Sequence, residues 1–214
     1  MHRGGGEPPI EEESGFYYLP VPTNNYSVGE VIAVFTSPLY QVRSVTRPDA
    51  DGIVRTTSQP LSISQKTRRN LSAAVSANVA GALEAELGRG QVSRLEVSLE
   101  NVQTLTASED EMRTALEARL AGNASSCRTL RDNFDDGIRL DVIETIVVAD
   151  PTIAAYDSTG SKIDIDPDVV GRVDAKLQFD VSSASDGSVV GEAVGIGYTT
   201  NPNLARNVFR DSCN

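Results

Sequence analysis

A period-two alternation of apolar and polar residues near the C-terminus constrains the fold most strongly. The alternating apolar positions are Val173, Ala175, Leu177, Phe179 and Val181, followed by Val190, Val194, Ile196 and Tyr198. Alternation of this kind is typical of strands with one buried face. Between the two runs lies Ser185-Asp186-Gly187-Ser188, which has the composition of a tight turn. The sequence therefore predicts a β-hairpin in which Phe179 faces Val194 and Leu177 faces Ile196.

Small residues occupy every second position of the second expected strand: Gly191, Ala193, Gly195 and Gly197. Strand glycines cost stability, so a column of them indicates that something approaches the backbone closely. Three interpretations stay open. In the first, the stems of Lys176 and Gln178 lie across the bare backbone, or a neighbouring strand twists or coils there. In the second, another chain or an apolar ligand occupies a flat groove. In the third, a dinucleotide binds. The third is disfavoured because Thr200 stands where a third glycine is needed and no helix is expected to follow.

Periodicity and capping signals predict the other elements. Leu71, Val75, Val79, Leu83 and Leu87 recur every four residues ahead of Gly88, as in a helix with one buried face. Ser108 and Glu111 form a capping box, and Glu144 interrupts an alternating strand, where a bulge or a strand end is expected. The predicted elements are a hairpin over residues 28–45, helices over 67–87, 108–122 and 125–133, and strands over 93–102 and 137–150.

These elements predict a two-layer α+β fold with a mostly antiparallel sheet and helices packed on one face. Residues 1–15 are a polar Gly/Pro/Glu arm that is not expected to order by itself. Residues 16–200 are expected to form a single domain and residues 201–214 a C-terminal tail. A chain of 214 residues is long enough to bury a core without metals. Its apolar runs stay well short of the ~20 residues that a membrane-spanning helix needs.

The net charge of the protein and the distribution of its basic residues indicate which partners it can bind. The formal net charge is −11, so binding to nucleic acid is not expected. Lys66, Arg68 and Arg69 form the one basic cluster, at a helix start where positive charge opposes the helix dipole. This cluster is accidental or marks an anionic partner, for which the run Glu11–Glu13 of the same or a neighbouring copy is the nearest candidate. Most of the burial that anchors the arm would then come from Ile10, Phe16, Tyr17 and Tyr18.

The sequence lacks the residues that several kinds of catalytic site and metal site require. His2 is the only histidine, which argues against Ser-His-Asp and Cys-His catalysis and against His-rich metal sites. The run Asp164, Asp166, Asp168 begins like a calcium loop, but Val169 and Ala175 stand at positions that need glycine and an acidic residue. We expect solvated turns there and around Asp132, Asp135 and Asp136, and no catalytic residue, metal or cofactor.

The sequence contains two cysteines, Cys127 and Cys213. Two cysteines alone do not distinguish an oxidising compartment from a reducing one. In an oxidising compartment a disulfide between them would tie down the C-terminus, and in the cytoplasm both would be free thiols. Because the first residues lack the apolar stretch of a signal peptide, the sequence favours the cytoplasm, with export as the alternative if a leader has been removed.

Taken together, these patterns predict a non-catalytic interaction or assembly protein, whose arm and sheet surface contact a protein partner or copies of itself in a homo-oligomer. The candidate contact residues are Phe16, Tyr17, Tyr18, Lys66, Arg68, Arg69, Gly191, Gly195 and Gly197. The alternative is a small-ligand-binding domain with a pocket between sheet and helices. An enzyme that uses carboxylates is the third possibility.

Overall fold

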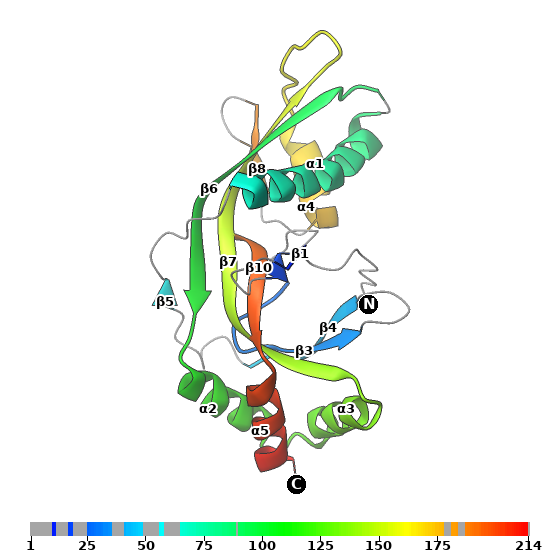
Figure 1. Ribbon diagram of the computed structural model, residues 1–214. Coiled ribbons are helices and arrows are strands. Elements are labelled where there is room, and N and C mark those ends of the chain that lie inside the picture. The colour runs from blue at the N-terminus through cyan, green and yellow to red at the C-terminus, as the bar shows by residue number, and fades with distance from the viewer. Residues whose placement is uncertain are drawn as a thin grey trace.

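The computed structural model describes residues 10–11, 17–18, 25–35, 41–48, 56–57, 65–88, 90–177, 181–183 and 187–213. Within these residues ten strands form one sheet, and the strand pairings are antiparallel (Figure 1). Helices pack against the sheet at both ends of an elongated molecule. The prediction of an α+β fold with an antiparallel sheet is confirmed.

One long strand, β7 (Arg139–Tyr156), organises the sheet. One of its edges pairs with β3 (Val31–Phe35) and then with β6 (Arg94–Thr106). The opposite edge pairs with β10 (Val194–Asn201) and then with β9 (Val189–Gly191). The remaining strands extend these four: β4 (Gln41–Thr46) on β3, β5 (Thr56–Thr57) on β6, β8 (Val181–Ser183) on β9, and β2 (Tyr17–Tyr18) with β1 (Ile10–Glu11) on β10.

The helices divide between the two ends of the sheet (Figure 1). At one end α1 (Gln65–Leu87) and α4 (Pro167–Leu177) lie together over β6 and β7. At the other end α2 (Glu109–Leu120), α3 (Ala124–Asp135) and α5 (Pro202–Ser212) cover a larger core. A third, smaller cluster is formed by residues of α1, β6, β7 and β10: Leu71, Leu99, Val102, Val147, Ala149 and Ile196.

The elements with local signals form as predicted. Leu71, Val75, Val79 and Leu83 are almost fully buried on α1. The capping box is present, because Ser108 Oγ accepts from Glu111 N at 3.3 Å and Glu111 Oε2 accepts from Ser108 N at 3.0 Å. The expected irregularity in β7 is also confirmed: Thr199 pairs with Thr145 and Thr200 with Ile143, so Glu144 is the extra residue of a bulge.

The expected hairpin of residues 173–181 with 190–198 is wrong. Val173 and Leu177 belong to α4, and Val194 pairs with Ala149 of β7. Asp166 and Pro167 start the helix: Asp166 Oδ1 accepts from Asp168 N at 2.7 Å, and proline suits the first helical turn. The hairpin that does form joins β8 to β9, with Val181 opposite Gly191. Phe179 lies outside the described residues.

The C-terminal segment, expected as a tail, forms a helix that packs into the core. β10 leads directly into α5, contrary to the expectation that no helix follows Thr200. Asn201 caps α5 by accepting from Leu204 N at 3.0 Å, and Pro202 occupies its first turn. Leu204, Ala205 and Val208 are buried. This segment therefore completes the larger core, covered by α2, α3 and α5, which is called the lower core below.

Candidate functional site

The N-terminal arm meets the expected glycine column on β10. Tyr17 pairs with Tyr198 and Tyr18 pairs with Gly197, so β2 extends the sheet beyond β10. The ring of Tyr17 lies 5.9 Å from that of Tyr198, and Tyr26 approaches Tyr198 from 6.1 Å. Tyr198 is only 2% exposed. The aromatic anchor predicted from sequence therefore includes Tyr17, which docks on the chain's own sheet.

A polar network lies beside this aromatic group. Both carboxylate oxygens of the buried Asp141 accept from Arg139, at 2.9 and 2.6 Å, and Thr200 Oγ1 donates to Oδ2 at 3.0 Å. The hydrogen bond with Asp141 raises the pKa of Arg139, and an interaction with Tyr17 adds to the rise. The network links β7 to β10 and to the arm. Since arginine and threonine engage both oxygens, Asp141 is a structural group rather than a general base.

A second buried carboxylate, Glu30, is also held by an arginine. Its Oε2 atom accepts from Ser27 N at 2.9 Å and from Arg47 Nε at 3.0 Å, and Arg47 donates to Asn25 O as well. Burial raises the pKa of Glu30, and the hydrogen bonds oppose that rise. The contacts fix the turn before β3, which is a structural role.

Asp150 of β7 connects β6 and the β9–β10 turn, at the point where the pairing of β7 changes from β10 to β9. Its Oδ1 atom accepts from Ala193 N at 2.8 Å, and Oδ2 accepts from Asn101 Nδ2 at 2.7 Å. Asn101 and Ala193 both have a φ of 48°, which is unfavourable for residues with a side chain. Asn101 lies in the β6 bulge between Glu100 and Gln103. One carboxylate thus holds two strained turns in place.

Replacing Asp150 with alanine is expected to lower the free energy of unfolding by about 2 kcal/mol, because both turns lose a hydrogen bond to a carboxylate. Asp150→Asn is the matched control. Its amide oxygen still accepts from Ala193 N, and Asn101 can rotate its own amide to accept from the new donor, so the loss should be smaller. Urea denaturation of the three proteins gives the order. Equal stability of Asp150→Ala and wild type would contradict this role.

The glycines of the column lie in different surroundings, so each position is explained separately. At Gly191 a Cβ atom would lie 2.9 Å from both Pro151 Cγ and Val194 Cγ2, so the site excludes a side chain. Gly197 is buried where β10 receives both β7 and the arm. Gly195 is buried opposite Val148, and a bulge at Ile196 separates the two glycines in register. Lys176 belongs to α4, so the prediction that its stem lies across this strand is wrong, and at Gly197 a segment of the same chain lies beside the strand.

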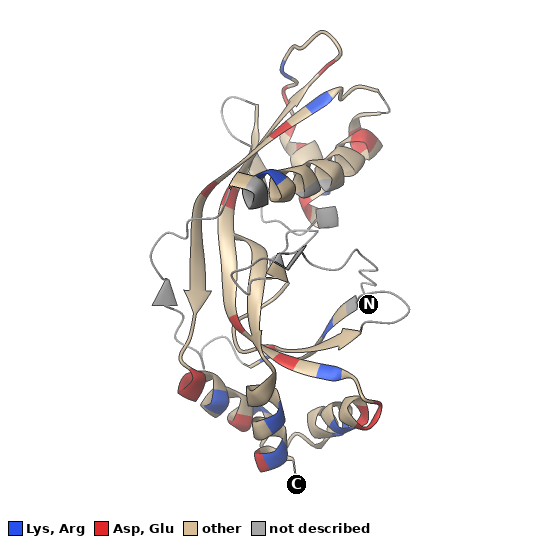
Figure 2. Ribbon diagram, in the orientation of Figure 1, with Lys and Arg blue, Asp and Glu red and all other residues tan. Residues whose placement is uncertain are grey.

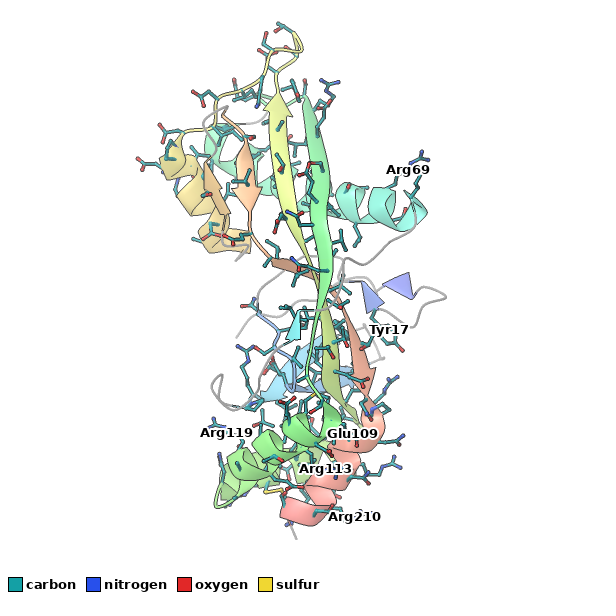
Figure 3. All side chains as sticks on the ribbon, turned by 90° about the vertical axis from the view of Figure 1, so that its left-hand side faces the viewer. Tyr17, Arg69, Glu109, Arg113, Arg119 and Arg210 are labelled. Carbon is teal, nitrogen blue, oxygen red and sulfur yellow. A yellow bond between two sulfur atoms is a disulfide. The ribbon has the colours of Figure 1, made fainter. Side chains whose placement is uncertain are left out.

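The basic cluster lies on the first turns of α1, away from the arm's contact with β10. Arg69 is exposed and points away from the sheet (Figure 3). Lys66 and Arg68 belong to the same helix, but their side chains lie outside the described part of the chain, as do Phe16 and residues 12–16. The interaction of Glu11–Glu13 with this cluster stays a prediction.

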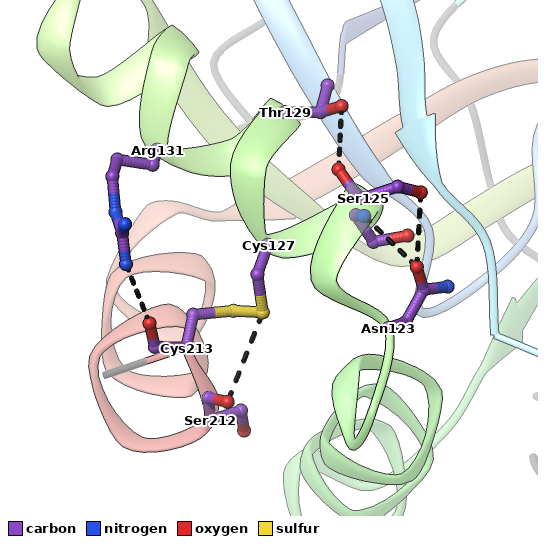
Figure 4. Close-up of a disulfide and its surroundings, with 8 residues drawn as sticks. Asn123, Ser125, Cys127, Thr129, Arg131, Ser212 and Cys213 are labelled. Atoms are coloured by element: carbon purple, nitrogen blue, oxygen red, sulfur yellow. Dashed lines mark hydrogen bonds between the residues drawn. A yellow bond between two sulfur atoms is a disulfide. The ribbon is translucent and has the colours of Figure 1, made fainter.

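Cys127 and Cys213 form the disulfide that the sequence left as one of two alternatives (Figure 4). It connects α3 to the last turn of α5. Arg131 Nη2 also donates to Cys213 O at 2.9 Å, and the rings of Phe134 and Phe209 pack 4.9 Å apart. The C-terminal helix is therefore held to the lower core by a covalent bond and by packing.

Over Arg94–Ser98 the outer edge of β6 pairs with no described strand. β5 pairs with Thr106 and Leu105, and no other described strand pairs with this edge. Along the strand Leu95, Val97 and Leu99 face α1, and the alternate positions are exposed; in Figure 2 the strand starts with a blue segment and continues with red ones. Arg94 stacks on the ring of Tyr156 at 4.4 Å and pairs with Glu96 at 3.3 Å. An unpaired strand edge is a template for another strand.

The described part of the chain holds no metal-binding cluster. Among the described residues, no group of three or more His, Cys, Asp or Glu side chains is placed to hold a metal ion, and this includes Asp164, Asp166 and Asp168. No helix in the described ranges is long and apolar enough to cross a membrane. That the protein is not an enzyme stays a prediction.

No protein-family model matches the sequence, and no curated protein matches it. A solved structure of a bacterial gasdermin from Bradyrhizobium tropiciagri aligns with 87% of this chain and 81% of the gasdermin chain, at 12% identity and a TM-score of 0.41. A score of this size does not establish a shared function, so function is inferred from the residues of this chain.

Proposed function

We propose that this protein is a non-catalytic assembly protein that binds a second copy of itself through its sheet. The open outer edge of β6 carries the proposal. Over Arg94–Ser98 it offers backbone donors and acceptors for which no described strand provides partners. Backbone pairing at such an edge is a common mode of protein association. The buried carboxylates support a structural rather than catalytic role, because Asp141 and Glu30 are both held by arginines.

Size-exclusion chromatography with light scattering tests this function. The expected molar mass at high concentration is twice the chain mass of 22.8 kDa, with a return to the chain mass on dilution. A molar mass equal to that of the single chain at every concentration up to the solubility limit would reject self-assembly.

We place this function in an oxidising compartment, the alternative to the cytoplasm that the sequence analysis kept open. The disulfide between Cys127 and Cys213 supports this, because structural disulfides persist in oxidising compartments and are rare in the reducing cytosol. Counting free thiols in denaturant, in protein taken directly from its native source, tests the point. No free thiol is expected, and two per chain would contradict it.

A further inference from the structure

One carboxylate oxygen of Glu30 is buried without a hydrogen bond. The side chain has no exposed surface, and its Oε2 atom accepts from Ser27 N at 2.9 Å and from two guanidinium nitrogens of Arg47 at 2.9 and 3.0 Å. Among the described residues, Oε1 has no hydrogen-bond partner. A buried oxygen without a donor is costly as part of a charged group. Oε1 is therefore the atom at which Glu30 can bind a proton.

Arg47 joins this carboxylate to the base of the arm, which is the turn over residues 25–30. It also donates to the carbonyl oxygen of Asn25. Tyr26 comes next in the chain, and its ring packs on Tyr198, the ring on which the arm packs as well. The position of this turn, and with it one neighbour of the docked arm, therefore depends on Arg47.

The charge of Glu30 decides how strongly Arg47 is held. Burial raises the pKa of Glu30, and Ser44, Arg47 and Ser27 oppose that rise. Four other charged residues lie on the nearest parts of β4 and β7: Arg43, Arg139, Asp141 and Glu144. Of the charged groups in the described part of the chain, Arg47 alone acts on the pKa of Glu30.

Protonation of Glu30 affects the contact with Arg47 and the global stability in opposite directions. Detachment of Arg47 would leave a buried anion unpaired, so the pKa of Glu30 is higher with Arg47 detached than with Arg47 bound, and acid favours detachment. The unfolded chain exposes Glu30 to water, where its pKa has the ordinary value. This group therefore adds global stability as the pH falls through its raised pKa, and that stability is lost again as the pH rises.

We propose that Glu30 and Arg47 form an acid-sensitive clamp on the base of the arm. A proton bound at Oε1 neutralises Glu30 and releases Arg47 to water, which frees the turn and weakens the docking of β2 on β10. The side chain of Arg47 is already 45% exposed, so it can leave without opening the core. In acid, the β10 edge at Gly197 and Tyr198, which β2 covers, becomes more accessible.

Hydrogen exchange over a pH series, corrected for the intrinsic exchange rate at each pH, tests the clamp. In wild-type protein the protection of residues 17–18 and 25–30 should fall roughly 10-fold as the pH drops, with a midpoint above the ordinary range of glutamate. Glu30→Gln has the shape of the protonated form, so its protection should be low already at neutral pH and constant through this range. Arg47→Met should show the opposite pH dependence. It leaves a buried anion unpaired at neutral pH, and protection should rise as Glu30 becomes neutral.

Glu144→Gln is the matched control and should keep the wild-type profile. It neutralises a carboxylate next to Ile143, whose amide donates to Glu30 O, and it leaves Arg47 paired. Melting temperatures check the fold, and Glu30→Gln should melt no lower than wild type at neutral pH, because it removes a buried charge. A wild-type exchange profile in Glu30→Gln, or a loss of protection with acid in Arg47→Met, would overturn the clamp. If Glu30→Gln does not fold, the sign of the pH dependence in Arg47→Met decides by itself.

Discussion

Replacing Cys127 and Cys213 with serine is expected to lower the free energy of unfolding by about 4–5 kcal/mol. The bond closes a loop between cysteines 86 positions apart, and in the chain-entropy model the stabilisation grows with loop length. A reduction of this size is comparable to a large part of a domain's total stability. For a chain of this length each kcal/mol shifts the melting temperature by about 2–4 °C, so the double variant should melt roughly 10–20 °C lower.

The expected loss is concentrated at one end of the molecule. α5 contributes Leu204, Ala205 and Val208 to the lower core, and the disulfide attaches its last turn to α3 (Figure 4). Without the bond, α5 can detach from α2 and α3 at a lower cost than global unfolding. Hydrogen exchange of the amides in α5 should therefore quicken more than exchange in α1, which lies at the far end.

Reductant provides the internal control. Wild-type protein reduced in denaturant and refolded under reducing conditions should melt like the serine variant, and the variant itself should not respond to reductant. If wild-type protein melts at the same temperature with and without the bond, packing such as that of Phe134 on Phe209 already holds α5, and the disulfide adds no net stability.

The elements that could be predicted from sequence are those with local signals. The four-residue spacing of α1, the capping box of α2 and the alternation of β6 all involve neighbours in the chain, and each appears in the structure. The bulge at Glu144 could be predicted because a charged residue interrupted an otherwise apolar alternation. In these segments local preference and tertiary packing agree.

The failure at residues 167–177 has a physical cause. Val173, Ala175 and Leu177 alternate by chance, and Val169, Val170 and Val173 have the spacing of a buried helix face. The acidic run around Asp166 predicts a solvated turn, although an acidic or amide side chain followed by proline is also a typical helix start. Here helix capping by Asp166 and Pro167 is the stronger signal, and the alternation that follows is accidental.

Partners distant in sequence could not be predicted. Val194 pairs with Ala149, and alternation alone does not say which strand another strand joins. Asp150 was missed as well, since its role depends on two turns from distant strands. The sequence carries one signal for this site, an asparagine in the middle of the expected strand. Asparagine tolerates a positive φ better than most residues, and Asn101 adopts one.

Deleting residues 1–19 is expected to lower the free energy of unfolding by about 3 kcal/mol. The deletion removes β1 and β2 and uncovers the side of Tyr198 on which Tyr17 packs. Burial of a large side chain contributes about 1.5–3 kcal/mol, and an aromatic pair adds about 0.5–1.5 kcal/mol. The arm also supplies Tyr17 to the network around Arg139. The melting temperature should fall by roughly 6–12 °C.

Point variants separate the contributions to arm docking. Tyr17→Ala should account for most of the loss, because it removes the ring from Tyr198. Tyr17→Phe keeps the ring and loses only the hydroxyl near Arg139, so it should cost about 1 kcal/mol or less. Glu→Gln changes at residues 11–13 should have a small effect that disappears at high salt, since exposed ion pairs are individually weak and screened.

Removal of residues 1–9 is the matched truncation, because it leaves both arm strands in place, and it should change the melting temperature little. Full destabilisation by this shorter truncation would show that stability depends on residues ahead of β1 instead of on Tyr17. Equal melting of the 1–19 deletion and the wild type would show that Tyr26 and the other neighbours of Tyr198 are sufficient to cover it. In that case the small residue at Gly197 would need a reason other than the arm that lies against it.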